Sequence, residues 1–288
     1  MDYVLHLLIL ISIFSILAIS LNYMAGFTGI VSVHHASFYG LGAYATAILT
    51  SRYGFTFLPS VVAGVAITAL FAWLASYPIL RLRHDSQILV SIGLSFIVFN
   101  LMLNWTDLTD GPLGIKGIHA PTILGFSFFQ KPLFLLLVLA ALALTYWFFR
   151  HLTLSPYGTI LKGIRENPTV ASVNGHAVTR YQRSVFVMGA VFAALAGSFI
   201  ATFLTFIEPK LFDLMLSVFI LVMVILGGLG NLKGSIAGAA IMILIPELLR
   251  FAGFPASIIG ELQQMTYGLI LMLLMFFRPE GLFGEYKI

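Results

Sequence analysis

Long uncharged apolar runs recur along this chain of 288 residues, and they limit its fold more than any other feature. A helix needs about 20 residues, and no fewer than about 17, to cross the hydrocarbon of a membrane. Most of the runs reach this length, although the last must borrow flanking residues. The runs are 4–21, 57–80, 86–106, 132–149, 184–207, 214–232 and 262–277. Two further apolar intervals, 22–51 and 234–249, are together rich in Gly, Ser and His.

These spans must be helices. Lipid offers no partner for an open sheet edge, and a closed barrel needs alternating apolar and polar residues, which the runs lack. Hydrophobic residues make up 60% of the chain and the mean hydropathy is +1.02, more than one soluble core could bury. The sequence therefore predicts an all-α fold, a polytopic transmembrane helical bundle of about 8–10 spans.

The first run is not expected to be a cleaved signal, because no basic segment precedes it and it lacks a small-residue cleavage pattern. The chain has no cysteine, so disulfides and thiolate metal sites are excluded. The net charge of +4 is spread over loops and does not indicate nucleic-acid binding.

The positions of Lys and Arg predict the topology, since cytoplasmic loops carry the excess of both. Five basic residues fall in loops expected outside: Arg52, Lys116, Lys131, Lys210 and Arg250. The other ten are expected inside: Arg81, Arg83, Arg150, Lys162, Arg165, Arg180, Arg183, Lys233, Arg278 and Lys287. This bias places the C-terminus in the cytoplasm. The side of the N-terminus depends on whether 22–51 holds one span, or a half-span followed by a span.

Residues 154–183 form the one long polar, basic interval. They divide a single membrane domain, 1–288, into halves 1–153 and 184–288. Ser155-Pro156 and Asn167-Pro168 each predict a helix start, and Gly175 is placed to end the second helix in a left-handed conformation. Apolar stripes are expected on both helices, at Ile160, Leu161 and Ile164 on the first and at Val170, Ala171 and Val173 on the second. A solvated connector lying on the headgroups is the alternative.

Glycine clusters mark one interval in each half. The first runs from Gly26 and Gly29 to Ala43, and the second runs from Gly227, Gly228 and Gly230 to Ala239. Gly-interrupted segments at corresponding positions point to broken helices along a substrate path. Close helix packing through small residues is the alternative.

Several polar residues are expected at membrane depth. Asn22, Ser32, His35 and Ser37 are candidates to line a polar path, with His34 beside them. Interhelical hydrogen bonding is the alternative for all of them. Glu247 is expected to pair with Arg250 at i+3.

The chain carries no motif for ATP hydrolysis, for other catalysis or for proton-driven transport. It contains no phosphate-binding G-x-x-x-x-G-K-[ST] loop, no H-E-x-x-H metal site and no G-x-S-x-G nucleophile elbow. An intramembrane series of Asp and Glu that could relay protons is also missing. These absences argue against an enzyme and against a proton-driven carrier, and no metal or cofactor is expected.

Several segments together match a known family pattern: 158–175, Arg180-Tyr181, 186–197, 22–44, the loop 111–118, 208–234, Glu247 and the ending 278–282. In these segments the chain resembles the permease subunits of branched-chain amino acid ABC importers. The Gly-Pro-Leu-Gly-Ile loop favours the LivM-like subunit over its LivH-like sister. His34 departs from the family, which commonly has a small residue before the histidine that matches His35.

The resemblance implies a permease without ATPase activity, placed as a multi-pass protein in a bacterial inner membrane. Its implied partners are a homologous LivH-like permease, two cytoplasmic ATP-binding subunits and a periplasmic binding protein, with no nucleic acid. The stretch with Arg165, Glu166, Asn167, Ala171 and Gly175 matches the segment that couples the permease to an ATPase. Alternating access, driven by those ATPases, would import leucine, isoleucine or valine. Related permeases carry urea, short amides or other small molecules, and a self-sufficient channel or carrier is a further alternative.

Overall fold

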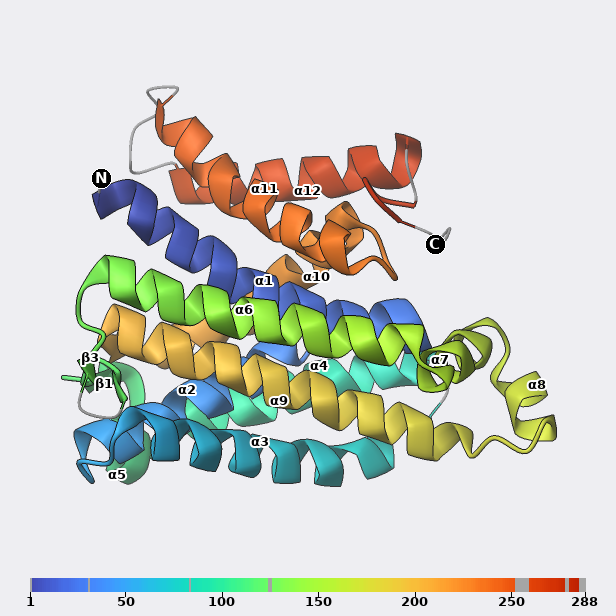
Figure 1. Cartoon of the computed structure of the whole chain (residues 1–288), viewed down its shortest axis with the longest axis horizontal. Coiled ribbons are helices and arrows are strands. Elements are labelled where there is room, and N and C mark those ends of the chain that lie inside the picture. The colour runs from blue at the N-terminus through green and yellow to red at the C-terminus, as the bar shows by residue number, and fades with distance from the viewer. Residues whose placement is uncertain are drawn as a thin grey trace.

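The computed structural model describes residues 2–30, 32–82, 84–123, 126–251, 259–277 and 280–284, and these form a bundle of long helices (Figure 1). Three basic residues of the topology prediction, Arg83, Arg278 and Lys287, lie outside the described residues. The long helices are α1 (Asp2–Thr28), α2 (His35–Ser51), α3 (Phe57–Ile79), α4 (His84–Asn104), α6 (Lys131–Leu154), α9 (Val178–Leu204), α10 (Leu214–Gly227), α11 (Leu232–Phe251) and α12 (Ile259–Phe277).

Short elements fill the connections. They are α5 (Thr106–Thr109), η1 (Gly111–Leu113), β1 (Ile115–Lys116), β2 (Thr122–Ile123), β3 (Phe126–Ser127), α7 (Pro156–Glu166), α8 (Pro168–Val173), β4 (Phe206–Ile207) and η2 (Pro209–Phe212). Strand β1 pairs antiparallel with β4, which ties the loop after α4 to the loop after α9, and β2 pairs with β3 as a small hairpin.

Helix α1 lies at the centre of the bundle. It is apolar on every side, and a helix of that kind is stable only when it is surrounded. Its residues from Ser15 to Thr28 are buried, and it packs against α6, α9, α10 and α11. Because α6 precedes residues 154–183 and the other three helices follow them, the two halves of the chain share one core.

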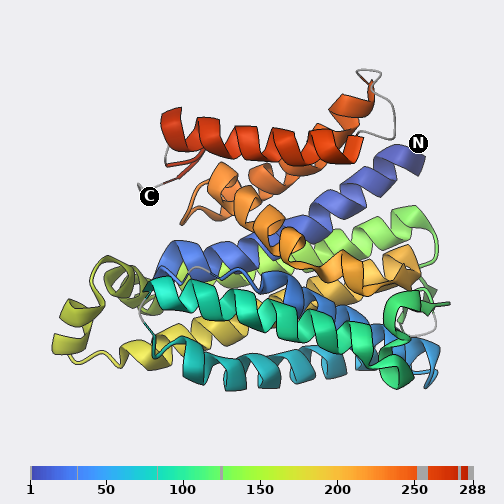
Figure 2. The same ribbon diagram turned by 180° about the vertical axis from the view of Figure 1, so that it is seen from behind.

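The two ends of the bundle differ in character. The N-terminus, α5 and the short strands lie at one end, and α7 and α8 project from the other, where the described chain also ends (Figures 1 and 2). The start of α1 meets the end of α9 through the rings of His6 and Phe203, whose centroids are 5.0 Å apart. The N-terminus therefore lies on the side opposite α7 and α8, which the sequence left open.

Seven described helical segments are long and apolar enough to cross a membrane. Helix α2, with 17 residues, and α12, with 19, lie beside them in the bundle. The all-α, polytopic fold that the sequence predicts is confirmed. Within the stretch 22–51, residues 22–28 are the end of the long helix α1, the described residues 29, 30 and 32–34 are not helical, and α2 follows. The stretch therefore holds one further helix, and not a separate half-span.

Candidate functional site

The polar interval 154–183 folds into the two short helices expected of it, α7 and α8. Asn167 caps α8 by accepting hydrogen bonds from the backbone N–H groups of Thr169 and Val170, at 3.0 and 3.1 Å. Gly175 follows with φ +84°, the left-handed turn that was predicted to end the helix. Helix α7 begins at Pro156 as predicted, with Ser155 at its N-cap position. The Ser155 side chain does not cap the helix, because its hydroxyl donates backward to the carbonyl of Leu152 at 2.7 Å.

Only one of the two expected apolar stripes is packed. On α7, Leu161 and Ile164 are buried, as predicted. On α8, Ala171 is buried, but Val170 and Val173 are 54% and 82% exposed, which corrects the prediction for this helix. Glu166, Asn167 and Gly175 are exposed as well. The tip of the loop therefore presents an open apolar and polar surface, as a docking site requires.

Arg165 lies differently from its neighbours. Its side chain is half-buried, and its guanidinium donates a hydrogen bond to the backbone carbonyl of Gly26 near the end of α1. The side chain also passes Gly29, which turns the chain with φ +73°. The last carbonyls of a helix lack partners within it and attract cations. Arg165 thus joins α7 directly to the point where α1 breaks off.

A cleft of about 380 Å³ opens beside this loop, lined by Tyr157, His176, Arg180, Tyr181 and Ser184 among others. The hydroxyls of Tyr157 and Ser184 are 2.5 Å apart, which fixes α7 against α9. Burial raises the pKa of Tyr157, which further disfavours loss of its hydroxyl proton. The cleft gives the loop a shaped and partly basic face.

Asn22 joins the two glycine-rich intervals. Its amide nitrogen donates to the carbonyls of Gly228 and Asn231, at 3.2 and 3.0 Å, and to the hydroxyl of Ser235 at 2.7 Å. Its carbonyl oxygen accepts from the backbone N–H of Gly230 at 2.9 Å. The side chain is fully buried, so it binds α1 to the turn between α10 and α11 through all its usable hydrogen-bonding atoms.

Gly26 makes this junction sterically feasible. A Cβ atom at this position would collide with Oδ1 of Asn22 and with the backbone of Gly230. The two intervals that were paired from sequence therefore meet in space, at the end of α1 that Arg165 contacts. Of the path residues that the sequence singled out, Asn22, Gly26, Ser32, His35, Ser37, Gly227, Gly228 and Gly230 are buried and Gly29 is half-buried.

The break before α2 is held by serines of other helices. The backbone N–H of Val33 donates to Ser91 at 3.2 Å, and its carbonyl accepts from Ser95 at 3.3 Å. The N–H of Ala36 donates to Ser217 at the start of α10, at 3.0 Å. In lipid each freed backbone group needs such a partner. Sequence reasoning missed these serines, although Ser91 and Ser95 stand four residues apart in an otherwise apolar run.

The two histidines are packed inside this region. His35 Nε2 lies 2.8 Å from the hydroxyl of Ser20, and His34 Nδ1 lies 3.0 Å from that of Ser32. The His34 ring also contacts Phe38 and Phe186, with centroids 4.8 and 5.3 Å away. This is the interhelical role that the sequence offered as an alternative. The expected Glu247–Arg250 ion pair is confirmed at 3.3 Å.

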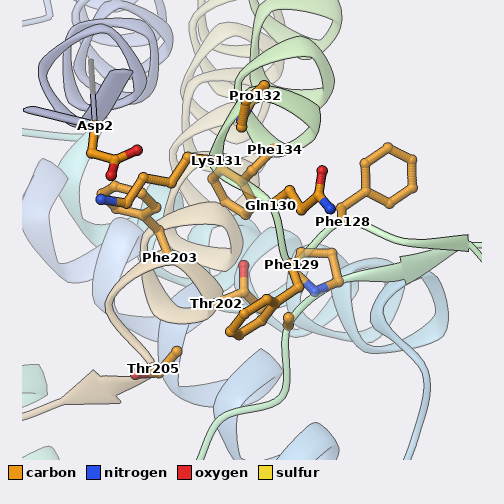
Figure 3. A pocket seen from close by; sticks show the side chains of 12 residues that line it. Asp2, Phe128, Phe129, Gln130, Lys131, Pro132, Phe134, Thr202, Phe203 and Thr205 are labelled. Atoms are coloured by element: carbon orange, nitrogen blue, oxygen red, sulfur yellow. The ribbon is translucent and has the colours of Figure 1, made fainter. Parts of the chain in front are cut away.

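The opposite end is braced by loops. Arg52 pairs with Asp110 at 2.6 Å and so fastens the α2–α3 turn to the loop after α4. A second cleft, of about 510 Å³, lies between the start of α1, the β3–α6 connection and the end of α9. Figure 3 shows Asp2 and Lys131 facing one another at this cleft, with the rings of Phe129, Phe134 and Phe203 around it.

The long apolar helices make this a multi-pass membrane protein, and a buried break such as that between α1 and α2 is typical of transporters. The chain belongs to the family described as branched-chain amino acid transport system / permease component, whose sequence model matches residues 3–277.

Relatives support this membership along nearly the whole chain. The high-affinity branched-chain amino acid transport system permease protein LivM of Salmonella typhimurium is 30% identical over 293 residues, covering 94% of this chain and 67% of the relative. The LivH permease protein of Escherichia coli K12 is 23% identical, covering 96% and 93%. A probable LivM protein of Methanocaldococcus jannaschii is 24% identical, covering 100% and 95%. No solved structure matches the chain.

Proposed function

We propose that this chain is the LivM-like permease subunit of an ABC importer for branched-chain amino acids. The observation that carries the proposal is the family match over residues 3–277, together with the higher identity to LivM, 30%, than to LivH, 23%. The names of these relatives favour leucine, isoleucine and valine over urea or short amides. A LivH-like permease is the sister subunit under this proposal.

The energy comes from other subunits. The sequence holds no phosphate-binding loop, so two cytoplasmic ATP-binding subunits would power the cycle. A periplasmic binding protein would deliver the substrate to the end that carries α5 and the short strands. In this orientation α7, α8 and the C-terminal segment face the cytoplasm of a bacterium and the N-terminus faces outward.

Different residues of 154–183 would dock on the ATPase and transmit its movement to the membrane helices. The exposed Glu166, Asn167 and α8 surface would dock on an ATPase, and Gly175 would set the turn that leaves it. The half-buried Arg165 would carry the movement of α7 to Gly26. Asn22 on α1 is hydrogen-bonded to Gly230 in the α10–α11 turn. A displacement of α1 would therefore move segments of both halves of the chain. ATP can drive this only if the two conformations bind it with different affinity.

Opening of the junction would expose the polar path. The polar residues Asn22, Ser32, His35 and Ser37 and the glycines at 26, 227, 228 and 230 are buried, and Gly29 is half-buried. They would line the path once α1 and the α10–α11 turn separate. Their hydroxyl and amide groups would then be free for water or substrate.

Reconstitution tests the proposal. Proteoliposomes that carry the chain with its sister permease and ATPases should take up labelled leucine only with ATP and the binding protein, and unlabelled valine should compete. The chain by itself should transport nothing. Uptake by the isolated chain would show a self-sufficient carrier, and competition by urea but not by valine would reassign the substrate.

A further inference from the structure

A groove of about 560 Å³ lies between η2 with α10 on one side and α12 on the other. The helices are held together beside it by the rings of Phe219 and Tyr267, whose centroids are 4.9 Å apart. We call this the α10–α12 groove. None of the path residues that the sequence singled out belongs to its lining.

Part of the groove lies within the membrane span. Ser20 lies eight residues before the end of α1 at Thr28, so it is about 12 Å from that end at about 1.5 Å per residue. His35 pairs with Ser20, and the next residue, Ala36, bonds to Ser217. Asp213 stands one helical turn before Ser217, so along the bundle axis it lies at a level between the two ends of α1. Helix α10 has 14 residues, and together with η2 before it the segment Pro209–Gly227 is long enough to cross a membrane.

The groove carries both signs of charge. Asp213 caps α10, accepting from the N–H of Leu216 at 2.9 Å with one carboxylate oxygen. Lys210 lines the same groove, and within the described part of the chain it forms no salt bridge. The amides of Gln263 and Gln264 face them from α12. Of these groups, Asp213 lies at membrane depth, where a charged side chain is costly against lipid and marks a substrate or ion pathway.

The rest of the lining is aliphatic. Met215, Val218 and Val222 continue along α10 below Asp213, and Leu271 lies across from them. Small-molecule sites combine such apolar walls with a few polar groups that fix orientation. An aliphatic α-amino acid has a matching pattern, because its ammonium and carboxylate sit at one end and its branched chain at the other.

We propose that the α10–α12 groove binds the amino acid during transport, with Asp213 holding the ammonium, Lys210 the carboxylate, and the α10 wall the side chain. This inference rests on the proposed function and adds the substrate-contacting residues. The N-terminus of α10 adds the positive potential of its helix dipole, which favours the substrate carboxylate. The hydrogen bond from Ala36 to Ser217 links the groove to the break before α2.

Site-directed thiol labelling tests the groove in the complete transporter. The chain contains no cysteine, so Met215→Cys introduces a single reporter. Met272→Cys on α12 is the matched control, since Met272 is 71% exposed, close to the 60% of Met215, and lies outside the groove. N-ethylmaleimide should label Met215→Cys in proteoliposomes. Leucine at about ten times its Kd should slow that labelling about 10-fold and leave Met272→Cys unchanged.

Charge variants assign the contacts. Asp213→Asn keeps the helix cap, because Asn and Asp cap equally well, yet it removes the anion. It should weaken protection by leucine about 10- to 100-fold, as expected for a lost hydrogen bond to a charged group. Lys210→Gln should act in the same direction, and Lys210→Arg should restore protection.

The outcomes separate this inference from the proposed function. If the wild-type complex takes up leucine but Met215→Cys is never labelled, or is labelled equally with and without leucine, lipid or the sister permease fills the groove and the inference is wrong. If the complex takes up no leucine, the proposed function fails. If leucine still protects Met215→Cys from labelling in that complex, the groove is an amino-acid site. If leucine gives no protection there, the inference is wrong as well.

Discussion

The guanidinium of Arg165 donates a hydrogen bond to the backbone carbonyl of Gly26, 139 residues earlier in the chain. This bond joins the projecting loop to the last turn of the central helix. Gly26 also packs against Gly230 and Asn22, so one cation lies next to the place where both halves of the chain meet. Movement of α7 therefore has a direct route to the core of the bundle.

Arg165→Gln should uncouple transport. The variant loses a hydrogen bond to a charged donor, worth about 1.5–3 kcal/mol, and we expect leucine uptake by the complete transporter to fall about 10-fold or more while ATP hydrolysis continues. Uptake and hydrolysis are measured in the same proteoliposomes. Lys233→Gln is the control, because Lys233 is exposed at the same end of the bundle. Normal uptake by Arg165→Gln would remove this residue from the coupling route.

Glu166→Lys should impair the docking of the ATPase subunits, which precedes any transmission through Arg165. Glu166 is exposed, so reversing its charge should leave the fold intact and weaken the association with the ATPase subunits. Co-purification at low and high salt measures this, since exposed charge contacts weaken as ionic strength rises. Glu261→Lys makes the same change at the first turn of α12 and should have no effect. An intact complex in the Glu166→Lys variant would contradict a docking role.

Asn22→Ala should destabilise the protein strongly. Four hydrogen bonds are lost, each worth about 0.6 kcal/mol on average between membrane helices, so the free energy of unfolding should fall by about 2–3 kcal/mol. Thermal unfolding in detergent measures the loss. Asn100→Ala is the matched control, because Asn100 is exposed and, among the residues the structure describes, its side-chain amide donates only to the carbonyl of Phe96 in its own helix, at 2.8 Å. Equal stability of the two variants would show that the junction contributes little.

Gly26→Ala should separate α1 from the α10–α11 turn. The added methyl group would collide with Asn22 and the backbone of Gly230, and overpacking of this kind costs about 1–3 kcal/mol. Gly93→Ala on α4 adds the same methyl group with nothing within 4 Å, so it should be neutral or slightly stabilising. Unfolding temperatures of the two variants test the contrast, and a stable Gly26→Ala protein would argue against the close approach.

Much of the fold follows from residues close in sequence. Apolar length predicts the spans, and the Pro and Gly signals of 154–183 predict two helices ending at Gly175. Contacts between distant segments could not be predicted in that way. Asn22 carries no sign of its partners more than 200 residues later, and Arg165 reads as a surface charge until its backbone partner is known. Val173 was expected in a packed stripe because the pattern marks apolar spacing, and the spacing does not say whether another element covers that face.

Asn167 and Ser155 both precede a helix that begins at the following proline, but only the Asn167 side chain caps its helix. The Asn167 side chain satisfies two N–H groups of α8, whereas the Ser155 hydroxyl bonds back to Leu152. Asn167→Ala should therefore destabilise α8 by about 1 kcal/mol, Asn167→Asp should retain its stability, and Ser155→Ala should leave α7 unchanged. Hydrogen exchange of the 169–174 amides reports this, with protection lost only in Asn167→Ala. Because α8 forms the exposed tip of the loop, the same variant should also bind the ATPase subunits less tightly. Unchanged exchange in Asn167→Ala would mean that α8 is held by its buried Ala171 and not by its cap.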